Sequence, residues 1–294
     1  MTRSEPFSES ILASPAKINL YLKVLGLRED GYHELDTLFY PVDDLHDTVR
    51  IEPGHDEHMY LRCPECPDLE STSNLIYKAW KAFGAATGFQ PGMFVTLNKT
   101  VPMGGGLGGG SSNAATMLRW LNENAGPNAL TTQELLALAA TLGADVPFFL
   151  MDGPALARGI GEELTPASPG LSGMTLVLVM PDLHVDTPWA FQAWDEANDF
   201  RKIDDSLTTL GKDTKNPSPV SPLEVVNDLE PVVFAKHPTL RKIKEKLIQT
   251  GAAAAAMSGS GASLFGLYRN RDSAMSAVRA LKENGTEIVV TECR

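Results

Sequence analysis

The residues with the clearest chemical potential form a glycine-rich segment in the first half of the chain. Six of the seven residues from Gly104 to Gly110 are glycine, and Ser111 and Ser112 follow at the start of a predicted helix. With no side chains in the way, backbone N–H groups can approach a ligand closely, and the positive helix end points at the same spot. This combination is typical of an anion site, where the hydroxyls cap the helix or contact a phosphate oxygen. The candidate segment comprises Pro102, Met103, Gly104, Gly105, Gly106, Leu107, Gly108, Gly109, Gly110, Ser111 and Ser112.

Other uses of such a segment fit the sequence less well. Gly104, Gly106 and Gly109 formally meet the G-x-G-x-x-G pattern of dinucleotide-binding folds. That site also needs an acidic residue about 20 positions later, after a further strand, whereas here one predicted helix follows another. A Walker loop needs Gly-Lys before Ser or Thr, and the chain lacks that sequence. A hinge or a tight packing loop would have no use for two serines that begin a helix.

The segment must be held by secondary-structure elements that the sequence also predicts. Ile18–Val24 alternates apolar and polar residues, which indicates a half-buried strand, and Asn74–Phe83 has apolar residues at helical spacing. Thr131 or Thr132 can cap a helix that carries Glu134 in its first turn. The expected elements of this half are strands at 18–24, 37–40, 48–51 and 94–98 and helices at 74–83, 114–122 and 132–141.

The second half of the chain begins after a cluster of proline, serine and glycine at 165–170, which marks a domain boundary. Residues 201–222 are polar with three prolines, which indicates a mobile insertion. Mixed strands and helices in two halves predict an α+β fold with domains at 1–167 and 168–294. The expected elements here are strands at 175–180, 263–268 and 287–291, a strand ending at 256 before a glycine loop at 258–261, and helices at 188–197, 240–249 and 273–283.

The composition limits the class of protein. Apolar residues make up 43% and charged residues 21% of the 294, an ordinary globular balance, and the net charge of −12 disfavours a nucleic-acid binder. In so acidic a chain an anion site must be built locally, from N–H groups and a few placed cations. The start of the chain lacks the apolar run of a signal peptide, no run could span a bilayer, and three cysteines make no disulfide framework. We therefore expect a soluble cytoplasmic enzyme with no nucleic-acid or membrane partner.

The segment Pro102–Ala115 resembles the phosphate-binding motif of the galactokinase, homoserine kinase and mevalonate kinase (GHMP) superfamily. Further similar motifs extend the resemblance over most of the chain, and their combination is specific although each alone is not. The resemblance implies two α/β layer-sandwich domains with mostly antiparallel or mixed sheets. It also implies ATP-dependent phosphorylation of the 2-hydroxyl of a cytidine diphosphate-linked sugar alcohol, a step of the methylerythritol phosphate route to isoprenoids. The further motifs are Ser14–Leu20, Asp30–Leu35, Gly143–Phe148 and Met257–Ser263.

The resemblance also assigns roles to individual residues. It implies that Asp145 is the catalytic base and that Lys17 keeps this carboxylate ionised and polarises the hydroxyl. From the residues alone, Asp145 could equally be a turn residue before Pro147, and Lys17 a surface lysine on a strand. Besides the glycine-rich segment, the implied ATP contacts are Asn74, Leu75 and Lys99. The implied substrate contacts are Asn19, Tyr32, His33 and Phe191.

ATP and Mg²⁺ are the cofactors that such a kinase implies, the metal being held mainly by the nucleotide phosphates and water. Ser112 is a candidate side-chain ligand, and no carboxylate ligand can be named. At Asn113 many members of the superfamily carry Asp. Because an amide brings no charge, the sequence does not assign Asn113 to the metal.

One motif lies outside the resemblance. His55 and His58 are followed by Cys63 and Cys66, four residues of the types that bind zinc. The alternative is a polar loop with two incidental thiols, and the His-to-Cys spacing is tight for a standard zinc finger.

Two rival functions stay open at this point. Another small-alcohol kinase of the superfamily, such as a homoserine kinase, would have the same phosphate loop, but an amino-acid substrate offers no base to stack beside Tyr32 and His33. A non-catalytic nucleotide-binding module would not need the Lys17 and Asp145 pair.

Overall fold

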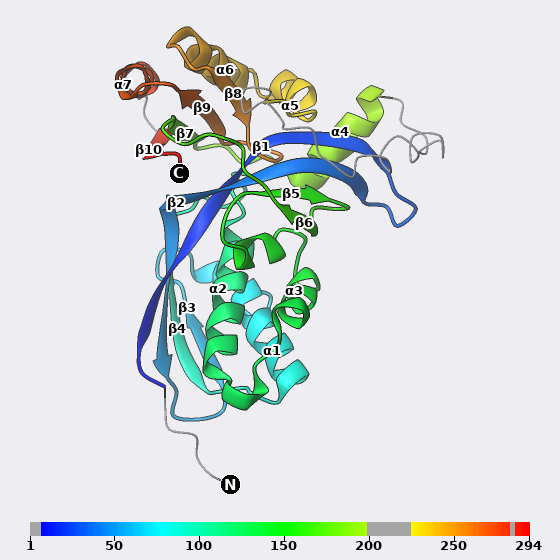
Figure 1. Cartoon of the computed structure of the whole chain (residues 1–294), viewed down its shortest axis with the longest axis vertical. Helices are drawn as coiled ribbons and strands as arrows, with labels where there is room; N and C mark the ends of the chain where they lie inside the picture. The colour runs from blue at the N-terminus through cyan, green and yellow to red at the C-terminus, as the bar shows by residue number, and fades with distance from the viewer. Residues whose placement is uncertain (1–6, 199–224, 283–285) are drawn as a thin grey trace. The chain divides into compact units, whose positions relative to one another are not determined.

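The computed structural model describes residues 7–198, 225–282 and 286–294. The predicted insertion at 201–222 therefore lies outside the described residues. The chain forms two compact units, each built from discontinuous segments. Unit 1 comprises Met1–Ala16, Val42–Pro102 and Gly108–Asp152, and unit 2 comprises Lys17–Pro41, Met103–Leu107 and Gly153–Arg294. The predicted domain boundary at residue 167 stays a prediction. The first two strands of the chain each contribute residues to both compact units (Figure 1).

The elements confirm the α+β class. The strands are β1 (Ser10–Leu27), β2 (His33–Pro53), β3 (Met59–Arg62), β4 (Met93–Asn98), β5 (Ala155–Arg158), β6 (Glu163–Pro166), β7 (Thr175–Pro181), β8 (Ala254–Met257), β9 (Leu264–Tyr268) and β10 (Thr286–Glu292). The α-helices are α1 (Leu75–Thr87), α2 (Gly109–Asn124), α3 (Thr132–Ala140), α4 (Thr187–Asn198), α5 (Glu230–Lys236), α6 (Pro238–Gln249) and α7 (Arg271–Leu281). Short 3₁₀ helices lie at Pro67–Leu69, Gly126–Asn128 and Pro147–Leu150.

Several of the sequence predictions for these elements were wrong in extent, among them the strand expected at 18–24, which is part of the longer β1. The strands expected at 37–40 and 48–51 are one continuous strand, β2, because the exposed pair Asp43 and Asp44 interrupts the apolar pattern without ending the pairing. The helix expected from residue 114 begins at Gly109, inside the glycine-rich segment. The four-residue strands β3, β5 and β6 are too short to give a periodic signal and were not predicted.

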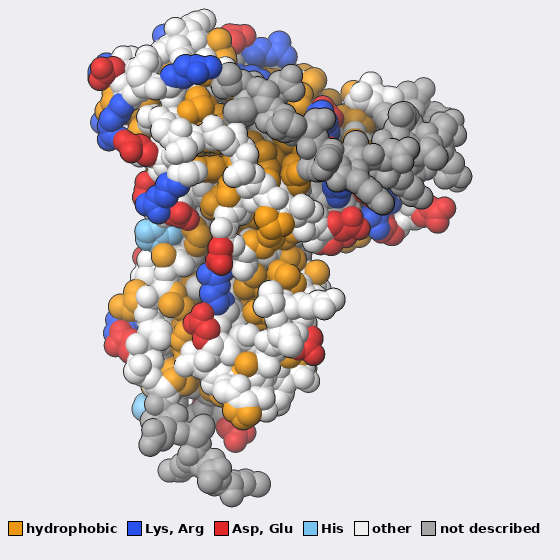
Figure 2. Space-filling view, in the orientation of Figure 1, with side chains coloured by type: hydrophobic (Ala, Val, Ile, Leu, Met, Phe, Trp, Pro, Cys, Tyr) orange, Lys and Arg blue, Asp and Glu red, His pale blue; other side chains and the backbone are white. Residues whose placement is uncertain are grey.

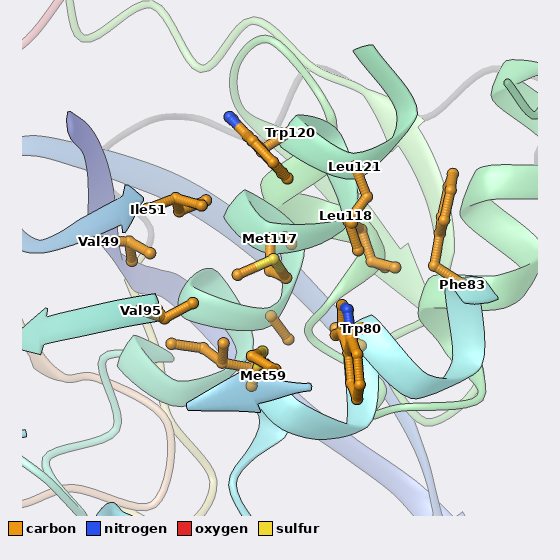
Figure 3. Packing of buried hydrophobic residues seen from close by; sticks show 14 of the residues in the cluster. Val49, Ile51, Met59, Trp80, Phe83, Val95, Met117, Leu118, Trp120 and Leu121 are labelled. Carbon is orange, nitrogen blue, oxygen red and sulfur yellow. The ribbon is translucent and has the colours of Figure 1, made fainter. Parts of the chain in front are cut away.

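In unit 1, helices α1, α2 and α3 pack together against the sheet strands β2, β3 and β4 (Figure 1). Strand β4 pairs with β2 in antiparallel and with β3 in parallel orientation. Figure 3 shows Met117, Leu118 and Leu121 of α2 meeting apolar side chains of the strands and of α1. Met117 and Leu118 are fully buried, so truncating either to Ala should cost about 2–5 kcal/mol of stability. This core fixes the direction of α2 and thereby the place of its N-terminus.

In unit 2, four antiparallel strands in the order β10-β7-β9-β8 form the sheet, and α6 and α7 contact it. Leu176–Val179 on β7 are all fully buried, which explains the uninterrupted apolar run of that strand. Strand β2 contributes Thr37–Phe39 to this unit by antiparallel pairing with β5, which pairs in turn with β6.

The surface view gives the distribution of charge on one face. Acidic and basic side chains are interspersed there rather than gathered by sign (Figure 2). Within the described part of the chain, no helix combines the length and the apolar character needed to cross a membrane.

Candidate functional site

The start of helix α2 in unit 1 lacks a side-chain cap. Its N-cap is Gly108, in the left-handed conformation (φ 70°), and makes no side-chain cap. By contrast, α1 and α3 are capped by the side chains of Asn74 and Thr131, which accept hydrogen bonds from N–H groups of the first turn. The leading N–H groups of α2 therefore get no hydrogen bond from an N-cap side chain. A Cβ atom on exposed Gly110 would meet only the Cδ1 atom of Leu75, at 3.8 Å, so a ligand can reach the backbone there.

Two of the predicted nucleotide contacts lie beside this helix start. The Lys99 ammonium nitrogen is 3.2 Å from the place a Cβ atom of Gly109 would occupy, and Leu75 faces Gly110. The side chain of Asn74, also a predicted nucleotide contact, forms hydrogen bonds within the protein. Its Oδ1 accepts from the Ile76 N–H at 2.9 Å, and its Nδ2 donates to the Leu69 carbonyl at 3.0 Å. Its side chain thus fixes the start of α1 and leaves Leu75 placed against the glycines.

A cluster of buried polar side chains forms hydrogen bonds with residues near the start of the same helix. Ser14 Oγ donates to Ser112 Oγ at 2.8 Å and accepts from Asn113 Nδ2 at 2.8 Å. Asn113 Nδ2 also donates to Asp47, a fully buried carboxylate that pairs with Lys99. Nothing near Asp47 in the chain distinguishes it from a surface charge, so its role was not predictable from the sequence.

The first half of the glycine-rich segment belongs to unit 2 and uses its glycines for packing. Gly104 (φ 67°) and Gly106 (φ 73°) adopt the left-handed conformation. A Cβ atom would lie 2.0 Å from the His184 Nδ1 atom at the first position and 2.1 Å from the Ser258 carbonyl oxygen at the second. The Ser258 hydroxyl donates to the Gly106 carbonyl at 2.9 Å. The six glycines therefore do not all have one role. Gly104 and Gly106 allow tight packing, which was the alternative considered from the sequence.

Lys17 lies in unit 2 on β1 and is 4% exposed. Its ammonium donates to Asn19 Oδ1 at 2.7 Å and lies 4.7 Å from the centre of the Phe39 ring. Asn19 Nδ2 donates to Thr37 Oγ1 at 2.8 Å, and the Asn19 N–H donates to the Ser258 hydroxyl at 3.1 Å. Lys17, predicted for catalysis, and Asn19, predicted for substrate binding, thus form one buried group. Ser258, in the glycine loop at 258–261, holds Asn19 in place.

Asp145 lies in unit 1, in the turn between α3 and the 3₁₀ helix Pro147–Leu150, and is half-buried. The Val146 N–H donates to the Gly143 carbonyl at 3.1 Å and closes the turn. The preceding helix has a complete capping box of Thr131 and Glu134, as the sequence predicted for its first turn.

Three of the four predicted substrate residues line one open pocket in unit 2, with a volume of about 430 Å³. They are Tyr32, His33 and Phe191. His33 stacks on Phe191, with 4.7 Å between ring centres, and its Nε2 atom lies 2.8 Å from Asp195 Oδ1. Asp195, which was not among the predicted site residues, also lines the pocket. It follows Phe191 by four residues on α4, the spacing that brings two side chains to one helix face.

The zinc alternative finds no support in the described residues, where no group of three or more His, Cys, Asp or Glu side chains is arranged to hold a metal ion. His58 instead pairs with Asp56, at 3.5 Å, and His55 packs edge-on against Phe94.

Comparison with known proteins agrees with the resemblance seen in the sequence. Models of the GHMP kinases N terminal domain and the GHMP kinases C terminal domain match residues 74–153 and 206–287. The chain is 44% identical over 286 residues to 4-diphosphocytidyl-2-C-methyl-D-erythritol kinase of Solidesulfovibrio magneticus, covering 95% of both chains. It is 40% identical over 279 residues to the same enzyme of Syntrophus aciditrophicus, covering 94% of this chain and 95% of the relative.

Solved structures agree as well. A crystal structure of 4-(cytidine 5'-diphospho)-2C-methyl-D-erythritol kinase matches with a TM-score of 0.75 at 35% identity, over 97% of this chain and 100% of the other. A homoserine kinase from Cytophaga hutchinsonii matches with a TM-score of 0.74 at 18% identity, over 99% of this chain and 96% of the other, which shows the shared fold alone. The chain therefore belongs to the GHMP kinases, a family of small-molecule kinases, and among them to the 4-diphosphocytidyl-2-C-methyl-D-erythritol kinases.

Proposed function

We propose that the chain transfers the γ-phosphoryl group of ATP to the 2-hydroxyl of 4-diphosphocytidyl-2-C-methyl-D-erythritol, in the methylerythritol phosphate pathway. The names of its relatives supply the substrate. The observation that carries the proposal is the start of α2, where glycines replace a side-chain cap and Lys99 lies beside them. A substrate-sized pocket lined by aromatic rings accompanies it in unit 2.

The phosphate-binding step follows from helix geometry. The first N–H groups of α2, on Gly109, Gly110 and Ser111, are free of an N-cap side chain and point along the helix axis toward its positive end. An ATP phosphate accepts these hydrogen bonds while the Lys99 ammonium offsets its charge. Such charge-assisted bonds are stronger than neutral ones, which lets an acidic protein hold a polyanion.

Chemistry at the acceptor hydroxyl needs a base and a cation. We assign the base to Asp145 and the cation to Lys17. In a loose phosphoryl-transfer transition state the proton leaves late, so an ordinary carboxylate can accept it. The side-chain oxygen Oδ1 of Asn19 accepts a hydrogen bond from the Lys17 ammonium, and the Phe39 ring lies beside the same ammonium, so both hold it in place. Lys17 then stabilises the negative charge that develops on the hydroxyl oxygen.

Mg²⁺ would neutralise the phosphate charges and align the transferred group. Ser112, the side chain considered for this metal, is fully buried, and its hydroxyl accepts the Ser14 hydrogen bond. It therefore suits the support of α2 better than direct ligation, and we place the metal on the nucleotide phosphates and water. Asn113 points to Ser14 and Asp47 and is not assigned to the metal.

The pocket in unit 2 can distinguish cytosine from uracil through His33. A carboxylate only accepts hydrogen bonds, so Asp195 requires the proton of the neutral ring to be on Nε2. This leaves Nδ1 as an acceptor, which suits the exocyclic amino group of cytosine and opposes the carbonyl oxygen of uracil. Tyr32, 59% exposed, is available to cover a face of the base, while Phe191 supports the histidine ring.

A steady-state assay tests the proposal. The purified chain is given ATP and Mg²⁺ with the cytidine diphosphate-linked alcohol, with homoserine and with mevalonate, and ADP release is recorded. We expect turnover with the first alcohol and background release with the other two. Equal or greater turnover of homoserine would refute the proposed substrate.

A further inference from the structure

A carboxylate outside all the motifs, Asp47, occupies the centre of the buried cluster in unit 1. It is 0% exposed. Its Oδ1 atom accepts from the N–H groups of Thr100 and Val101, both at 2.8 Å. Its Oδ2 atom accepts from Asn113 Nδ2 at 2.9 Å and from the Lys99 ammonium. Four donors thus converge on one side chain of β2.

These donors lie on both sides of the glycine-rich segment along the chain. Lys99–Val101 follow β4 and lead into the segment, whereas Asn113 lies in α2, which begins within the segment at Gly109 and continues beyond it. Asn113 reaches Ser14 as well, and Ser14 holds Ser112. One carboxylate therefore connects the chain before the glycines to the helix that begins at the last two of them.

The buried charges of Asp47 and Lys99 each depend on the other for stabilisation. Taking a charged group out of water costs several kcal/mol unless a counter-charge and hydrogen bonds replace the water. The Lys99 side chain is only 8% exposed, and Asp47 is its buried counter-charge. Without the carboxylate, the ammonium beside Gly109 would have no buried counter-charge, so it would turn toward solvent and away from the helix start.

We infer that Asp47 is a positioning residue for the nucleotide: it holds Lys99 and the start of α2 in the arrangement that receives the phosphates. It acts through these groups and does not touch the substrate. The inference rests on the proposed function, because it assumes that the helix start binds ATP phosphates.

The test uses Asp47→Asn, Lys99→Met and the double variant, with ATP affinity measured by calorimetry. In Asp47→Asn the new amide oxygen can still accept from the two backbone N–H groups, but the new NH₂ group would face two other donors, Lys99 and Asn113. We expect the ATP dissociation constant to rise at least about tenfold for each single variant, with the KM of the alcohol within about twofold of wild type. Because both residues act on one contact, the double variant should lose about as much affinity as the weaker-binding single variant.

Asn122→Ala is the matched control for stability. This side chain lies near the other end of α2, where it donates to the Leu130 carbonyl at 3.1 Å and accepts the Leu130 N–H at 2.6 Å. Its loss should lower the free energy of unfolding and leave ATP affinity unchanged. Comparing ATP affinity and stability in the two variants therefore distinguishes a positioning role of Asp47 from a general loss of helix stability.

Each outcome decides the matter. Wild-type ATP affinity in Asp47→Asn, or affinity losses that simply add in the double variant, would overturn the inference while the proposed function stands. If Asp47→Asn does not fold, Asn113→Ala, which removes one donor to the same carboxylate, should weaken ATP several-fold, and unchanged affinity would overturn the inference. Absence of ATP binding by the wild-type chain would overturn the proposed function itself.

Discussion

Replacing Gly110 by Ala separates ligand approach from protein stability. Gly110 is the second residue of α2, is exposed and has helical backbone, and a Cβ atom there meets only the Leu75 Cδ1 atom, at 3.8 Å. Alanine is favoured over glycine in helices by about 0.5–1 kcal/mol, so Gly110→Ala should be as stable as wild type or more stable by up to this amount. If a phosphate approaches this N–H group, the methyl group obstructs it. Losing one hydrogen bond to a charged group costs about 1.5–3 kcal/mol, or roughly a tenfold to hundredfold loss of ATP affinity.

Urea denaturation and ATP calorimetry on the same protein samples measure both quantities. Gly106→Ala is the contrasting variant, because its Cβ atom would lie 2.1 Å from the Ser258 carbonyl oxygen and its φ is +73°. We expect it to lose about 1–3 kcal/mol of stability from the left-handed backbone alone. A Gly110→Ala protein that binds ATP as tightly as wild type would refute the placement of phosphate at the start of α2.

The remaining predictions concern catalysis, specificity and metal content. Asp145→Asn should keep ATP affinity and lower kcat at least about 10²-fold, and Lys17→Met should also lower it; the losses in the double variant should be far from additive, and additive losses would show separate roles. Tyr32→Ala should raise the KM of the alcohol but not of ATP, and an increase in the KM of ATP alone would contradict the pocket assignment. The wild-type chain should prefer the cytidine substrate over its uridine analogue by at least about tenfold, and Asp195→Asn, which frees the choice of tautomer at His33, should reduce that preference; equal use of both by wild type would contradict the role of the ring. Elemental analysis of the purified protein should find no stoichiometric zinc, and one zinc per chain would restore the zinc alternative for the Cys-x-x-Cys loop.

The sequence predicted best the features that depend on neighbours along the chain. The helix at 132–141 was predicted from its capping pattern, and the structure shows both hydrogen bonds of the capping box at Thr131 and Glu134. Residues 94–98 were predicted as the strand that leads into the glycines, and β4 covers this range. Such local signals are carried by a few adjacent side chains, so they can be recognised without the fold.

Features that depend on distant segments were not predictable in this way. The six glycines of the segment look alike in sequence, yet Gly106 packs against Ser258, 152 residues away, whereas Gly110 is open. Asp47 receives its donors from 52 to 66 residues away, and no periodic pattern marks it. Asp195 could have been suspected from its four-residue spacing to Phe191, but its partner His33 is 162 residues away.

The most direct test of the whole account is a single-turnover reaction with ATP labelled in its γ-phosphoryl group. Excess wild-type chain is mixed with the labelled nucleotide, Mg²⁺ and 4-diphosphocytidyl-2-C-methyl-D-erythritol, and the products are separated and located by phosphorus NMR. We predict that the label moves to the 2-hydroxyl of the alcohol, one phosphoryl group for each ADP formed. Label that stays on ATP, appears as inorganic phosphate, or reaches a different hydroxyl would contradict the account.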